Sequence, residues 1–66
     1  MSCEEIYVRH IENGIRAIRM GNKNPKEANV GLHLNKLKLV NLGLYEDLLQ
    51  KYSNVVKDYQ RKMLKN

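Results

Sequence analysis

The chain has 66 residues, a single cysteine and a formal net charge of +5, with 12 Lys and Arg against 7 Asp and Glu. A chain of this length forms one domain at most and buries only about 60% of the surface that it exposes when unfolded. Small folds of this kind usually depend on disulfides, a metal ion or a partner subunit. Cys3 has no second cysteine to pair with, and paired metal-ligand spacings are lacking, so we expect no internal disulfide, no metal and no cofactor.

The sequence also lacks the patterns of targeting and membrane segments. Its beginning is acidic and carries no apolar run, which argues against a signal or transit peptide. No stretch approaches the roughly 18 apolar residues of a membrane span. With one free cysteine, we expect a cytoplasmic protein that does not enter a membrane. The positive charge would attract nucleic acid or an acidic protein surface and favours neither of them.

The first predicted helix covers about residues 3–20. Ser2 at the N-cap and Glu5 three residues later form a capping-box pattern. Gly21 offers a left-handed C-terminal cap behind the cations of the last turn. The apolar residues of this segment share one side of the helix at about 100° per residue. They are Cys3, Tyr7, Val8, Ile11, Gly14, Ile15 and Ile18.

A row of cations follows the first helix and its connector, and we name it the basic ridge. Such a row could neutralise phosphates, which gives sequence-tolerant nucleic-acid binding as an alternative function. Glu5 and Glu12 partly neutralise the row, so an ordinary solvated helix face explains it as well. The ridge consists of Arg9, Arg16, Arg19 and Lys23.

The second predicted helix covers about residues 25–41 and begins with Asn24 at the N-cap, Pro25 at the first position and Glu27 at the third. Its apolar residues lie on two opposite sides. A helix that is apolar on two sides must be covered on two sides, so we expect this segment inside a bundle or between subunits. One row is Val30, Leu34 and Leu37, with Val40 at its edge, and the other is Ala28, Leu32 and Leu39, with Leu42 at its edge.

The same leucines could be read as a β-strand, because they alternate in pairs. The phase of the alternation slips after each pair, however, and no second strand is present to pair with the backbone. We therefore prefer the helix.

Gly43 separates two architectures. We favour a break there, which predicts a three-helix bundle whose third helix covers 44–64. Without the break, the second and third helices fuse, and the chain is a helical hairpin with one long second helix. Both versions leave apolar surface uncovered, so we expect an oligomer, with a homodimer or a larger protein as the partner. A helix-turn-helix at Gly43 is disfavoured, because it would present Glu46 and Asp47 to DNA phosphates.

The third predicted helix carries a tyrosine at every seventh position in the middle of its apolar face. Tyrosine combines a large apolar body with a polar tip and is enriched at protein interfaces, which suggests a docking stripe. The tyrosines can equally form the edge of the core, with their hydroxyls reaching water. The three are Tyr45, Tyr52 and Tyr59.

We find no catalytic motif in the sequence. Cys3 and His10 would lie about 10.5 Å apart along a helix axis, too far for a nucleophile and its base. We therefore predict a single all-α domain over residues 1–66 that is not an enzyme, takes no small-molecule substrate and acts as a protein–protein interaction module: a regulator, adaptor or inhibitor. A self-assembling structural subunit is a further alternative. The predicted partner-binding residues are Leu32, Leu39, Leu42, Tyr45, Tyr52 and Tyr59.

Overall fold

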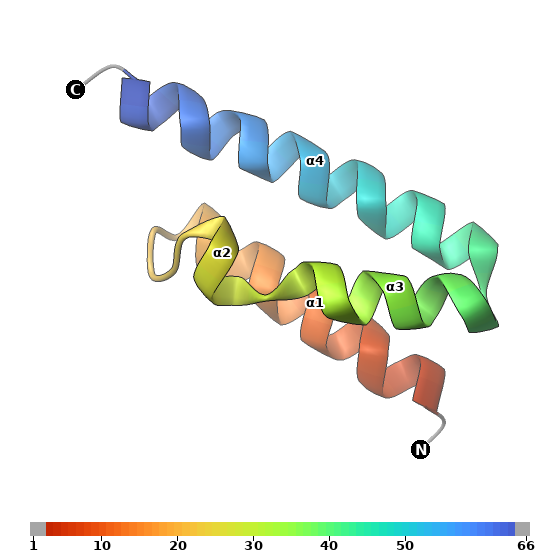
Figure 1. Cartoon of the computed structure of the whole chain (residues 1–66). Coiled ribbons are helices and arrows are strands. Elements are labelled where there is room, and N and C mark those ends of the chain that lie inside the picture. The colour runs from red at the N-terminus through yellow and green to blue at the C-terminus, as the bar shows by residue number, and fades with distance from the viewer. Residues whose placement is uncertain (1–2, 65–66) are drawn as a thin grey trace.

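The computed structural model describes residues 3–64, and these form an all-α bundle (Figure 1). Helix α1 spans Cys3–Arg19, α2 Pro25–Ala28, α3 Val30–Val40 and α4 Leu42–Leu64. Helices α1, α3 and α4 pack against one another, and α2 packs against α1. The leucine-rich segment is helical, so the strand alternative is wrong.

Helix α1 ends in a left-handed cap at Gly21, as predicted. The φ angle of Gly21 is 79°, a backbone conformation that glycine adopts without steric cost. The Asn22 N–H donates to the Ala17 carbonyl at 2.9 Å, and the Gly21 N–H donates to the Ile18 carbonyl at 3.1 Å. These two bonds make a Schellman motif, which satisfies carbonyls at the helix end. The predicted cap at Ser2 lies outside the described residues.

The start signal of the second predicted helix is confirmed, but its continuity is not. The Asn24 side chain accepts from the Glu27 N–H at 2.7 Å, and the Glu27 carboxylate accepts from the Asn24 N–H at 3.2 Å. Helix α2 then ends after one turn, because Asn29 adopts a left-handed conformation with φ 53°. Asparagine is one of the few residues that tolerate this region. The predicted helix over 25–41 is therefore two helices, and α3 begins in a new direction.

A break separates α3 from α4, but it lies at Asn41 and not at Gly43. The backbone of Asn41 is extended, with φ −155°. Its side-chain oxygen accepts from the Leu44 N–H at 3.1 Å, so Asn41 acts as the N-cap of α4. Its side-chain amide donates to the Glu4 carboxylate of α1. Gly43 is helical within α4, and the alternative of one long second helix is wrong.

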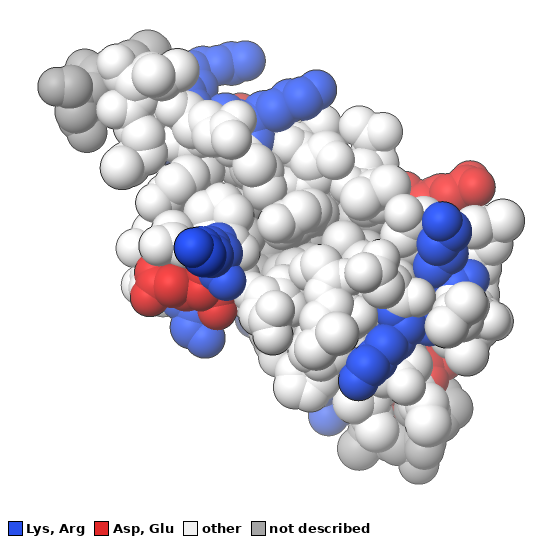
Figure 2. Space-filling model, viewed as in Figure 1, with Lys and Arg blue, Asp and Glu red and all other residues white. Residues whose placement is uncertain are grey.

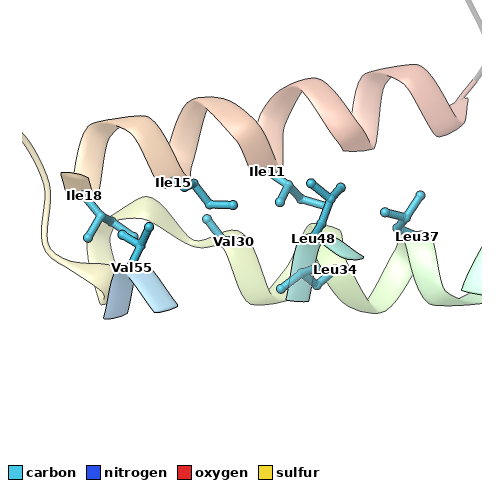
Figure 3. Close-up of a cluster of buried hydrophobic side chains, with 8 residues drawn as sticks. All are labelled: Ile11, Ile15, Ile18, Val30, Leu34, Leu37, Leu48 and Val55. Carbon is cyan, nitrogen blue, oxygen red and sulfur yellow. The ribbon is translucent and has the colours of Figure 1, made fainter. Parts of the chain in front are cut away.

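The core is built from one apolar row of each long helix (Figure 3). Gly14 lets α1 and α3 approach closely, because a Cβ at this position would overlap the Val30 side chain. No charged or polar side chain is buried among the described residues. The buried core consists of Ile11, Ile15 and Ile18 from α1, Val30, Leu34 and Leu37 from α3, and Leu48 and Val55 from α4.

Candidate docking surface

The two leucine rows of the central segment have opposite environments. Leu34 and Leu37 are 3% and 0% exposed at the centre of the bundle. Leu32 and Leu39, on the opposite side of α3, are 49% and 87% exposed, and Leu42 at the start of α4 is 54% exposed. No element within residues 3–64 covers this second row. We name Leu32, Leu39 and Leu42 the leucine surface.

Two lysines of α3 lie over aromatic rings of the neighbouring helices. The Lys38 amine lies 5.5 Å from the ring centroid of Tyr45 on α4, and the Lys36 amine lies 5.9 Å from that of Tyr7 on α1. Such contacts are cation–π interactions. The face that α3 and α4 present in Figure 2 is largely uncharged in its middle, with most charged side chains toward its borders.

The predicted tyrosine stripe lies at the edge of the core. Tyr45, Tyr52 and Tyr59 are each partly buried and pack against the buried cluster. This packing agrees with the alternative that the tyrosines form the edge of the core. Each tyrosine side chain is less exposed than that of Leu39 and therefore offers less surface to a partner. The structure thus does not bring the six predicted docking residues together as one equally exposed patch.

The basic ridge is exposed along its whole length. Among the described residues, the side chains of Arg9, Arg16 and Arg19 form no ion pair. Acidic side chains nevertheless lie among them: Glu12 shares one shallow depression with Arg9 and Arg16, and another with Arg16 and Arg19. Lys23 lies beyond the end of α1 in the connector. The ridge is a mixed charged face, and nucleic-acid binding stays a prediction.

The packing of α1 on α3 brings together two histidines that lie far apart in the sequence. The rings of His10 and His33 stack with their centroids 4.6 Å apart, and the Tyr7 ring lies 6.4 Å from His33. Cys3 is exposed. Within residues 3–64, no group of three or more His, Cys, Asp and Glu side chains could hold a metal ion.

Another concave surface, which the sequence did not predict, lies between the C-terminal end of α1 and the second half of α4. Figure 1 shows α4 diverging from α3 and α2 toward its C-terminal end. The cavity there has a volume of about 520 Å³. Ile18 and Val55 lie in it, and Figure 3 shows them side by side at one end of the core. We name this cavity the end groove.

No helix in the described part of the chain has the length and apolar character that crossing a membrane requires. Comparison of the chain with family models, with curated proteins and with solved structures finds no match.

Proposed function

We propose that the protein is a small non-enzymatic protein–protein interaction module whose leucine surface packs against a second copy of the chain. The observation that supports this most is the 87% exposure of Leu39 on a helix whose opposite side forms the centre of the core. Single exposed leucines are common on protein surfaces. Leu32 and Leu39 share one side of α3 at about 100° per residue, and Leu42 is exposed at the start of α4. Exposed apolar side chains that form a contiguous patch mark interaction sites.

The total surface area also supports a partner. The chain exposes 4988 Å², whereas a typical monomeric protein of 7.7 kDa exposes about 4300 Å². The difference of roughly 700 Å² is close to the roughly 800 Å² that each partner contributes to a standard interface.

The spacing of the leucines favours a second copy as the occupant. A two-fold interface brings the same patch of both subunits together, so the patch must be complementary to itself. Leu32 and Leu39 are seven residues apart, with Asn35 and Lys36 midway between them. Two α3 helices crossing in antiparallel fashion near this midpoint place Leu32 of one copy opposite Leu39 of the other. Each leucine then finds an apolar neighbour.

Leu39→Asp is expected to weaken self-association at least about a hundredfold, because the change places an unpaired carboxylate in an apolar contact and both copies carry it. The matched control is Leu64→Asp, since Leu64 is also 87% exposed but lies at the far end of α4. Sedimentation velocity over a range of concentrations should give a dimer for the wild type and for Leu64→Asp, and a monomer for Leu39→Asp.

A wild-type protein that stays monomeric up to millimolar concentration would contradict the dimer. If the protein instead binds a different protein, and Leu39→Asp abolishes that binding, the interaction function stands but the leucine surface has another partner than a second copy. Species larger than a dimer would instead favour a structural subunit.

Nucleic-acid binding by the basic ridge is the second candidate, supported by arginines that are exposed and form no ion pair within residues 3–64. If it is correct, Arg9→Glu combined with Arg16→Glu should remove most of the affinity for generic duplex DNA and flatten its salt dependence. Lys57→Glu combined with Arg61→Glu, on α4, changes the net charge equally and is the control. Fluorescence anisotropy of labelled DNA measures the affinity of both variants. Equal losses of affinity would mean that DNA binding depends on the net charge and not on the basic ridge.

A further inference from the structure

The end groove has an apolar floor. Ile18 and Val55 are 2% and 6% exposed and form its base, and the Tyr59 ring packs beside them. Two methionines line the groove as well: Met20 is 67% exposed and Met63 is 59% exposed. Methionine side chains are unbranched and polarisable, so they adapt to the shape of a bound apolar group. Because Ile18 and Val55 are nearly buried, the accessible apolar surface of the groove comes mainly from the two methionines.

The rim of the groove is cationic. Arg19 reaches it from α1, and Lys51 and Lys62 reach it from α4, whereas Asp58 is its one acidic residue. Within residues 3–64, none of these four side chains makes an ion pair or a hydrogen bond. Three cations against one carboxylate give the rim a net positive charge, which attracts an acidic ligand.

The dimensions of the groove fit a short helix. Lys51 and Lys62 lie on the same side of α4 and are eleven residues apart, which corresponds to about 16 Å, or three helical turns. A helix laid along α4 at this point would cover the apolar floor and complete the bundle where α1 ends. Docking of an amphipathic helix into an apolar groove is a common mode of peptide recognition.

The charge of the rim decides between possible occupants. A second copy of the chain, with 12 Lys and Arg against 7 Asp and Glu, offers few carboxylates to a cationic rim. Nucleic acid would neutralise the cations but leave the apolar floor without a partner. An acidic amphipathic helix satisfies both parts of the groove, with its apolar side on the floor and its carboxylates beside the cations.

We infer that the end groove binds an acidic amphipathic helix of another protein. This inference extends the proposed interaction function and rests on it only in that the protein acts by binding proteins. The site is separate from the leucine surface, because Leu42 and Lys51 lie on opposite sides of α4 at about 100° per residue. A dimer would therefore present two such grooves and could join two acidic partners.

The test uses a labelled synthetic peptide of about 16 residues, with leucines at helical spacing and glutamates on both flanks. Fluorescence anisotropy should show saturable binding to the wild type, and replacing the glutamates by glutamines should weaken it at least about tenfold. Lys51→Glu combined with Lys62→Glu should cause a similar loss. Lys57→Glu combined with Arg61→Glu, at two positions of the same helix that do not line the groove, carries the same charge change and should alter the affinity by less than about twofold.

Amide NMR spectra confirm the fold of each variant and locate the bound peptide. We expect the peptide to shift the signals of Ile18, Val55 and Tyr59 and to leave those around Leu39 unchanged. No saturable binding, equal binding of the glutamine peptide, or equal losses in the two double variants would overturn the inference. Since Leu39→Asp leaves the groove intact, its dimerisation result and the peptide result can fail independently.

Discussion

Leu37→Ala is expected to lower the free energy of unfolding by about 2–5 kcal/mol, the range for large-to-small changes at buried leucines. Leu37 is fully buried in the cluster that joins α1, α3 and α4. A chain of this size has a total stability of only about 3–10 kcal/mol. The substitution should therefore unfold a measurable fraction of the protein at room temperature, which urea denaturation followed by circular dichroism will show.

Leu39→Ala provides the control for this prediction, because it makes the same chemical change two residues along the same helix. Leu39 is 87% exposed, so its truncation should alter the stability of the monomer by less than about 0.5 kcal/mol. The measurement should be made at two protein concentrations, since the proposed dimer would add a concentration-dependent contribution to stability. Equal losses for Leu37→Ala and Leu39→Ala at low concentration would contradict the assignment of one leucine row to the core.

Gly14→Ala should destabilise the protein by about 1–3 kcal/mol, the usual cost of overpacking. In an exposed helix the same change would gain about 1 kcal/mol, because alanine has the higher helix propensity. At Gly14 the added methyl group would overlap the Val30 side chain and lie 3.6 Å from the Ala28 Cβ. Val30 is itself 1% exposed and has little room to move. The contact between α1 and α3 must therefore open.

The control for Gly14→Ala is Gly31→Ala on α3. A Cβ at Gly31 would meet nothing within 4 Å, and the residue is exposed. We expect this variant to be more stable by about 0.5–1 kcal/mol, through helix propensity alone. Denaturant midpoints measure both variants. Shifts of the same sign in the two would mean that α1 and α3 do not pack at Gly14.

The parts of the fold that the sequence predicted correctly depend on neighbouring residues. The cap at Gly21 and the capping box of Asn24 and Glu27 are set within a few positions of each helix end, so the residue types suffice to predict them. The division of the leucines into two rows follows from helical periodicity alone. The row with Leu32 and Leu39 was predicted to face a partner, because the first helix is too short to cover both apolar rows of the central segment.

The breaks at Asn29 and Asn41 could not be predicted with the same certainty. The chain has eight asparagines, and any of them can cap a helix or adopt a left-handed conformation. The choice of Asn41 over Gly43 involves Glu4, a residue 37 positions away that bonds the Asn41 side chain. Such a contact exists only once α1 and α4 have packed.

The same limit applies to the candidate sites. The exposure of Leu39 follows from its position on a helix, whereas the partial burial of Tyr45 depends on how closely α4 packs on α3. The stack of His10 on His33 and the end groove each need two helices at a particular distance. Spacing along one helix carries no information on that distance.

The bond between Asn41 and Glu4 ties the junction of α3 and α4 to the first turn of α1, whereas the opposite end of α4 runs past the end of α1 (Figure 1). The molecule is thus clamped at one end and free at the other. Opening costs least where tertiary support is thinnest, so amide protons near Met63 should exchange with solvent sooner than those near Leu48. A bundle that is fixed at one end can adjust the width of the end groove at its other end to ligands of different size.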